Sequence, residues 1–226
     1  MAINAVVQNN AIATIVNAPG AAGITLGIAV AGASATAAGN HIRDVGTTNT
    51  AGSPIYGIYA GALDDLNLSA NVMQQASVPV SGNFAANFIG IKIDEVSLAA
   101  ASVTVSLQDN VVEGSSSQPL IEVSDRERGT ADCIITGNQC RQGAKGFQQA
   151  QPVVFVTAAT AIIGDNRVQG AAGHSMEVTV TRTSNGSGAA ATPAATIVGN
   201  LVNGPIILNH MGLTLPWTPL NLVVSP

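Results

Sequence analysis

Apolar and polar residues alternate on both sides of an asparagine that recurs along the chain. Six positions carry it: Asn40, Asn71, Asn110, Asn138, Asn166 and Asn200. The residues five and three positions before each asparagine, and the residue two positions after it, are apolar, whereas the residue three positions after it is polar. Alternation with a period of two is typical of strands with one buried face, and helical spacing would not produce it. Each repeat therefore predicts a strand, a bend at the asparagine and a second strand.

The apolar positions of successive repeats predict three columns of a core. Three residues before the asparagine stand Ala37, Leu68, Leu107, Ile135, Ile163 and Ile197. Five residues before it stand Ala35, Leu66, Val105, Cys133, Ala161 and Ala195. Two residues after it stand Ile42, Met73, Val112, Cys140, Val168 and Val202. Like positions are expected to stack on like, one repeat above the next.

The bend itself has a pattern. The residue before each asparagine is Gly, Ala or Asp, and such residues suit a sharp turn. We expect the asparagine to adopt the left-handed conformation, which it tolerates better than most residues do. The alternative, six unrelated surface turns, does not explain the three apolar columns beside them.

A further apolar strand precedes each bend. These strands are expected at 24–28, 57–60, 89–93, 120–123, 153–156 and 177–180. A last one at 205–209 has no asparagine bend after it, so the regular repeats are expected to end there. Asn10 fits the template weakly and is a candidate for the first coil. The asparagines lie 28 to 39 residues apart, which predicts about seven coils.

No segment has the sustained 3.6-residue apolar stripe of a helix, so three strands per coil around a narrow core is the expected architecture. Between about residues 24 and 209 the chain resembles the right-handed parallel β-helix proteins of the pectate-lyase-like superfamily, which include NosD-type and phage tail-spike proteins. The resemblance implies an all-β parallel β-helix, or β-solenoid. It also implies that the six asparagines form a buried ladder, each side-chain amide bonding to the coils above and below.

The repeats predict one β-helix domain at 1–212, followed by an extended tail at 213–226. This tail contains Pro216, Trp217 and Pro219. Because proline cannot donate to a strand ladder, we expect the tail to run along an edge or to cap the last coil.

Charged residues make up only 9% of the chain, which has a net charge of -5 and eight Lys and Arg residues. No basic run is present, which disfavours nucleic acid as a partner. The apolar stretches are rich in Ala and Gly, which disfavours membrane insertion. The first apolar residues follow no basic segment, so a secretory signal is not expected there. A surface of this kind favours a protein that packs against copies of itself, outside the cell or on the surface of a particle.

The densest charge lies at 122–132. If the chain is an enzyme, its candidate catalytic residues are Asp125, Glu127, Arg128 and Asp132. The resemblance implies polysaccharide cleavage by aspartates on one strand face, often with calcium, and with an arginine or lysine as base. These four residues fall in one loop, however, and the acid pairs 64–65 and 94–95 follow predicted strands. A solvated loop with weak ion pairs is the competing interpretation.

Other chemistry has less support. His41, His174 and His210 are scattered and form no nucleophilic or zinc motif, so neither a cofactor nor a metal is expected. Cys133 and Cys140 are too few for a zinc site and occupy core columns, so they are expected to be buried. Phe155 is placed on a predicted core strand. The aromatic residues that remain available to bind a possible glycan are Tyr56, Tyr59 and Trp217.

The preferred hypothesis is a structural protein without catalysis, which forms part of a fibre or filament or is a surface or tail component. The segments 2–16 and 221–225 are uncharged and strand-like. Unpaired strand edges invite pairing with another chain, so a homo-oligomer or head-to-tail self-assembly is expected. The alternatives are a polysaccharide lyase or hydrolase, and a glycan-binding module.

Overall fold

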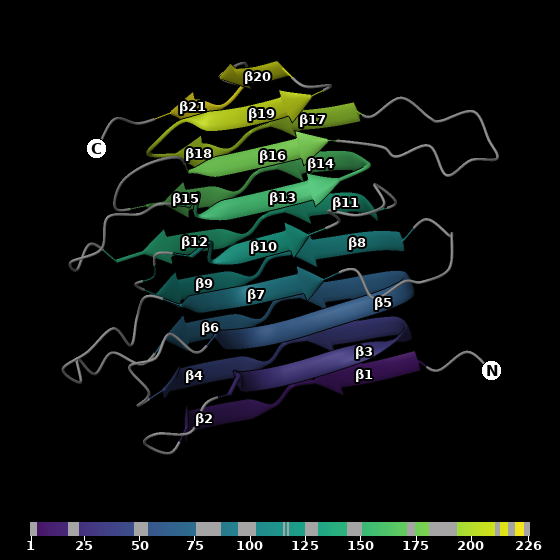
Figure 1. The fold of residues 1–226 in the computed structure, drawn as a ribbon, viewed down its shortest axis with the longest axis vertical. Helices are drawn as coiled ribbons and strands as arrows, with labels where there is room; N and C mark the ends of the chain where they lie inside the picture. The colour runs from purple at the N-terminus through teal and green to yellow at the C-terminus, as the bar shows by residue number, and fades with distance from the viewer. Residues whose placement is uncertain are drawn as a thin grey trace.

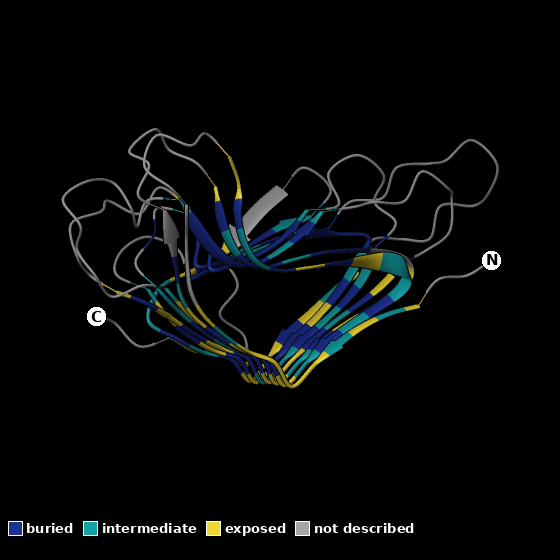
Figure 2. Ribbon diagram, turned by 90° about the horizontal axis from the view of Figure 1, so that it is seen from below, coloured by how far each residue is buried: buried dark blue, intermediate teal, exposed yellow. Residues whose placement is uncertain are grey.

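The protein is a parallel β-solenoid, in which strands from successive coils stack along one axis (Figure 1). The computed structural model describes residues 4–17, 23–47, 54–75, 87–94, 103–114, 116, 118–124, 131–143, 151–170, 175–180, 194–210, 213–216 and 220–223. The described strands form a 13-stranded and an 8-stranded sheet. The cross-section is triangular, with two faces meeting in a V and a third closing it (Figure 2).

We name the three faces by their relation to the asparagine bend. The entry face precedes the bend and contains β1 (Asn4–Gln8), β8 (Val103–Gln108), β11 (Ala131–Thr136), β14 (Thr160–Gly164) and β17 (Ala194–Val198). The exit face follows it and contains β2 (Ala11–Asn17), β4 (His41–Thr47), β6 (Val72–Gln75), β9 (Val111–Gly114), β12 (Gln139–Gln142), β15 (Arg167–Gln169), β18 (Leu201–Val202) and β21 (Leu222–Val223).

The closing face completes each coil. It contains β7 (Phe88–Asp94), β10 (Ile121–Ser124), β13 (Val154–Ala158), β16 (Met176–Val180), β19 (Ile206–His210) and β20 (Leu213–Pro216). Two long strands, β3 (Thr25–Ala38) and β5 (Ile55–Ser69), run from the closing face into the entry face without a break. These two strands join the closing and entry faces into the 13-stranded sheet.

The observed strand register brings the residues of each predicted column together. Leu68 pairs with Leu107, Leu107 with Ile135, and Ile135 with Ile163, all in parallel strands. All three columns are buried over residues 35–168, with at most 2% of any member exposed. Ile and Val side chains of the closing face supply two more inward columns. Burial of these stacked apolar columns is the main favourable contribution to folding.

The asparagine ladder is present and longer than predicted. The backbone N–H and Nδ2 of Asn71 donate to Oδ1 of Asn110, at 3.1 and 3.0 Å, and Nδ2 also donates to the carbonyl oxygen of Ala37. The same Nδ2–Oδ1 bond links every rung to the next, and the complete ladder is Asn10, Asn40, Asn71, Asn110, Asn138, Asn166, Asn200 and Asn221. The prediction that no asparagine bend follows 205–209 is therefore wrong.

The conformation predicted for the ladder asparagine belongs to the residue before it. Positive φ angles of 53° to 73° occur at Asn9, Gly39, Ala70, Asp109, Gly137, Asp165, Gly199 and Leu220. No ladder asparagine is among the described residues with positive φ. The preceding residue makes the turn, so the asparagine is left with its N–H and side chain directed at the neighbouring rung.

Complete coils run from β3 to β18, and the units at either end supply only part of a coil. The number of complete coils is therefore lower than the predicted seven. At the C-terminal end β20 pairs antiparallel with β19, and β21 pairs parallel with β18. Trp217 and Pro219 lie outside the described residues.

Candidate functional site

Ionisable and aromatic side chains gather on the outward side of the closing face. Between the inward Ile and Val positions, the register aligns one outward column on successive strands: Tyr59, Lys92, Glu122, Phe155 and Glu177. A second outward column beside it contains Asp94, Ser124, Thr157, Thr179 and Asn209. We call these two columns, together with Tyr56, the closing-face patch. In a chain with so few charged residues, this patch is the part of the described surface where groups able to bind a ligand are most concentrated.

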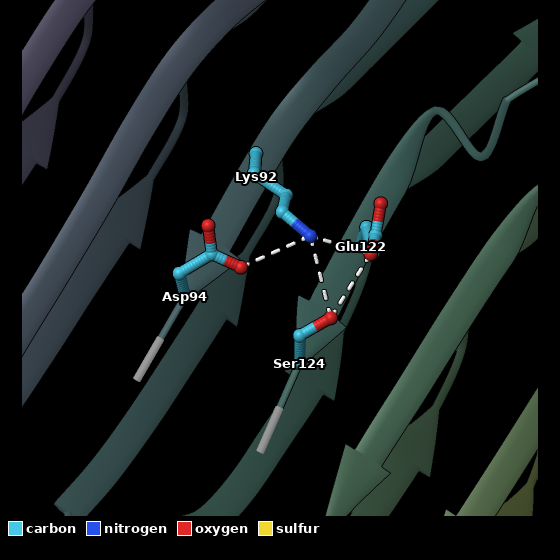
Figure 3. Close-up of polar contacts among 4 residues, drawn as sticks. All are labelled: Lys92, Asp94, Glu122 and Ser124. Carbon is cyan, nitrogen blue, oxygen red and sulfur yellow. Dashed lines mark hydrogen bonds and ion pairs between the residues drawn. The ribbon is translucent and has the colours of Figure 1, made fainter. Parts of the chain in front are cut away.

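Lys92 is the centre of the patch (Figure 3). Its Nζ lies 3.0 Å from Oδ1 of Asp94 and 2.5 Å from Oε1 of Glu122, and it donates to Oγ of Ser124 at 3.3 Å. The hydroxyl of Ser124 donates in turn to Oε1 of Glu122 at 2.9 Å. The Lys92 and Glu122 side chains are only 12% and 11% exposed. The ion pair therefore links β7 to β10 in a partly dry environment, where breaking it would leave a charge uncompensated.

The two tyrosines lie next to this ion pair. The ring centroids of Tyr56 and Tyr59 are 5.5 Å apart, with the rings tilted by 35°. Burial raises the pKa of Tyr59, and the charge of Asp94 and a hydrogen bond to that carboxylate raise it further. Burial also raises the pKa of Tyr56, and the positive charge of Lys92 opposes part of that rise. Both hydroxyl groups are therefore protonated at neutral pH, and that of Tyr59 donates a hydrogen bond to Asp94.

The geometry defines what the patch can do. An ammonium group has three N–H donors, and those of Lys92 have three oxygen partners in Asp94, Glu122 and Ser124. The lysine is thus engaged in holding two coils together. Tyr56, Tyr59 and the outward-facing Phe155 present aromatic surface, which can stack against the apolar face of a sugar ring.

Of the four candidate catalytic residues predicted from sequence, the structure describes only Asp132. Asp125, Glu127 and Arg128 lie outside the described residues. Asp132 lies on the entry face, on β11, and its Oδ1 accepts a hydrogen bond from the Thr160 hydroxyl of the next coil. Of the described residues, no group of three or more His, Cys, Asp and Glu could hold a metal ion.

Two placements differ from the sequence-based expectations. Asp94, expected after a strand, is the last residue of β7 and pairs with Lys92. Phe155 shares its column with Glu122 and Glu177, so its ring faces outward and is not part of the core. Alignment of the closing strands would have shown this column, whereas a search for local charge density includes Glu122 but not its partner Lys92, 30 positions away.

Cys133 and Cys140 are buried, as their columns predicted, and they form no disulfide. Burial raises the pKa of the Cys140 thiol to about 12. A thiol in this environment stays protonated and is a poor nucleophile. The cysteines therefore fill the core and take no part in the patch.

The two ends of the solenoid are the second candidate site. At the N-terminal end the core columns begin with Ala5, Val7 and Ile12, which are only partly buried. At the C-terminal end Ala195 is partly buried, whereas Ile197 and Val202 are only 3% and 1% exposed. Among the described strands, β1, β2 and β17 each pair on one side only. Apolar columns therefore meet solvent mainly at the N-terminal end of the described solenoid.

Comparisons of the chain with protein-family models, with curated proteins and with solved structures find no match. The described part of the chain contains no helix long and apolar enough to cross a membrane. Fold and site geometry are therefore the basis for any functional conclusion.

Proposed function

We propose that the protein is a structural protein that assembles with copies of itself, as part of a fibre or filament or as a surface or tail component. One observation carries this proposal: within the described residues, the core columns end in partly exposed apolar side chains, most clearly at the N-terminal end. Interior members such as Ala35 and Ala161 are at most 2% exposed, whereas Ala5 and Ala195 in the same column are partly exposed. Apolar surface and unpaired edges of this kind are normally covered by another chain.

The composition of the edge strands supports the same proposal. Monomeric proteins protect free edges with charges, prolines or short strands. Neither a charged residue nor a proline occurs in β1, β2 or β17, whose sequences are NAVVQ, AIATIVN and AATIV. An extracellular or particle-surface location and membership of the pectate-lyase-like superfamily fit this role and belong to the proposal.

The test is the size of the purified chain as a function of concentration. Sedimentation velocity should show species larger than the monomer whose share rises with concentration, and negative-stain electron microscopy should show elongated particles. A chain that remains monomeric at every concentration and appears as single short rods would overturn the proposal.

Glycan binding is the second candidate function, because Tyr56, Tyr59 and Phe155 lie on one outward face. Calorimetric titration with neutral and acidic oligosaccharides should give saturable binding that weakens at least tenfold in Tyr59→Ala. Leu26→Ala is the matched control, because Leu26 lies one coil away beside Tyr56. A parallel screen for reducing ends or unsaturated products, with and without calcium, separates passive binding from cleavage.

A further inference from the structure

We infer that two copies join through their N-terminal ends about a two-fold axis, so that β1 of each copy pairs antiparallel with β2 of the other. The inference rests on the proposed self-assembly and adds the symmetry of the contact and the residues that form it. Three features of the N-terminal end lead to it.

The first feature is the outline of the N-terminal end, onto which Figure 2 looks. β1 and β2 lie in one coil and form the two arms of the V at this end. Among the described strands each pairs only with the next coil, β1 with β3 and β2 with β4. At the other end the described exit face extends to β21, whereas the described entry face ends at β17 and β20 lies antiparallel on β19. An N-terminal end therefore matches a second N-terminal end better than it matches the described C-terminal end.

The second feature is the direction of the two edge strands. β1 runs toward the bend and β2 runs away from it. A two-fold axis that passes through the bend and bisects the V places each arm on the other arm of the second copy, so the edge strands meet antiparallel. Such a contact is isologous, because the same surface patch of each copy supplies both halves. It pairs the N–H and C=O groups along both edges at once.

The third feature is the set of residues that become neighbours. The bend is centred on the 9–10 peptide bond, so residues equally far from this bond lie opposite each other across the junction. Val7 therefore faces Ile12 of the partner subunit, and both are partly buried residues at the start of core columns. On the outward side Val6, which is 61% exposed, faces Ala13 of the partner subunit. Apolar residues thus meet apolar residues on both sides of the new strand pair.

The first rung of the ladder fits the same arrangement. Within the described residues Oδ1 of Asn10 accepts no hydrogen bond, and the junction places it beside the two-fold axis. The neighbouring Gln8 and Asn9 have exposed side chains. Each of their amide groups has two N–H donors, so these residues can satisfy the two oxygens across the junction.

Cysteine cross-linking tests the strand pairing. Val6→Cys and Ala13→Cys are made in separate chains, because both native side chains are exposed and the core is left unchanged. Opposite residues of an antiparallel pair have Cα atoms about 4.5–5.5 Å apart, within the range that a disulfide spans. Under mild oxidation an equimolar mixture of the two variants should form a disulfide-linked dimer, whereas neither variant alone should. The native chain is the control for the buried Cys133 and Cys140.

A charge at each end tests which end is the interface. Ala5→Lys places an ammonium group at the N-terminal start of a core column, where the junction would bury it without a partner. Ala195→Lys is the matched control, because Ala195 is also partly buried and stands at the other end of the same column. In sedimentation velocity the native chain and Ala195→Lys should form dimers, whereas Ala5→Lys should associate at least tenfold more weakly. Circular dichroism establishes that each variant is folded, and the cross-linking result does not depend on this pair.

The alternative outcomes are distinct. If the native chain assembles but the mixture gives no cross-linked dimer, or if one cysteine variant cross-links to itself, the edge strands do not pair as inferred. If Ala195→Lys weakens association as much as Ala5→Lys does, the N-terminal ends are not joined to each other. In each of these cases the inference is wrong although self-assembly stands. A native chain that stays monomeric at every concentration would overturn both the inference and the proposed function.

Discussion

Interior and terminal rungs of the ladder make the same bonds toward the next rung, but their surroundings differ. Asn71 is fully buried, and its Oδ1 accepts from the N–H and Nδ2 of Asn40. Asn10 is exposed, and within the described residues its Oδ1 accepts no hydrogen bond. Asn71 has a coil on both sides, whereas Asn10 has a described coil on one side only. In a stack of repeats that contact only their neighbours, the stabilisation from one residue depends on both of its interfaces.

The largest effect is expected at an interior rung. Asn71→Ala leaves the N–H and Nδ2 of Asn40 and the carbonyl oxygen of Ala37 without their partner in a dry interior. Unsatisfied buried groups destabilise by about 1–3 kcal/mol each, so we expect a loss of about 4 kcal/mol in the free energy of unfolding. Urea denaturation measures it. Asn67→Ala is the control, because Asn67 is exposed on β5, the strand that leads to this bend, and it should change the free energy by less than about 0.5 kcal/mol.

The core columns should show the same contrast between interior and end. Leu107→Ala creates a cavity at a fully buried position, and we expect a loss of about 3 kcal/mol. Val7→Ala at the partly buried start of the same column should cost less than about 1 kcal/mol in the monomer. Equal losses in urea denaturation would show that the end is as well packed as the interior, and the contrast would fail.

Alkaline pH should lower the stability of the protein through Cys140, an interior residue of a core column. Cys140 is buried and its thiol has a raised pKa of about 12, against 9.0 in the unfolded chain. The unfolded state therefore loses its proton first, so the contribution is intact below pH 9 and declines as the pH rises toward 12. At about 1.4 kcal/mol per pH unit, the loss at pH 10.5 is about 2 kcal/mol.

The comparison is with Cys140→Val, since valine occupies the same column at Val112 and Val168. The stability of this variant should fall less steeply between pH 9 and 12, as measured by urea denaturation at each pH. A thiol reagent at pH 8 should not label the native chain, whereas it should label Ile12→Cys at the start of the column. Equal slopes for the native chain and Cys140→Val would show that this thiol is not desolvated.

The interior was predictable from sequence because each coil repeats it. Leu68, Leu107 and Ile135 stand at the same offset from a ladder asparagine, and the observed register brings them together. Asn221 was missed because the residue three positions before it is a threonine, and Leu220 replaces the usual small or turn-prone residue. Leu220 nevertheless has a φ of 57°, as the turn requires. Tertiary stacking has overridden local preference at that position.

The closing-face patch was not predictable from local sequence. Lys92 and Glu122 become neighbours only through the register of β7 and β10, and the loops between coils vary in length. A candidate site chosen by local charge density therefore fell on 125–132, most of which lies outside the described residues. The sequence was aligned on the bend asparagines. Alignment on the closing strands of successive coils would have revealed the patch.

The smallest effect is expected at the terminal rung, and it is the most informative one for assembly. Asn10→Ala removes the Nδ2 bonds to Asn40 and to the carbonyl oxygen of Gln8, but the N–H of residue 10 still donates to Oδ1 of Asn40. We expect a loss below about 1 kcal/mol in the monomer, because water can replace these exposed bonds. In an assembly joined through the N-terminal end, the same residue is buried at the interface. Asn10→Ala should therefore weaken association by at least tenfold in sedimentation velocity while monomer stability barely changes. Association that is unaffected would show that the N-terminal end is not the interface.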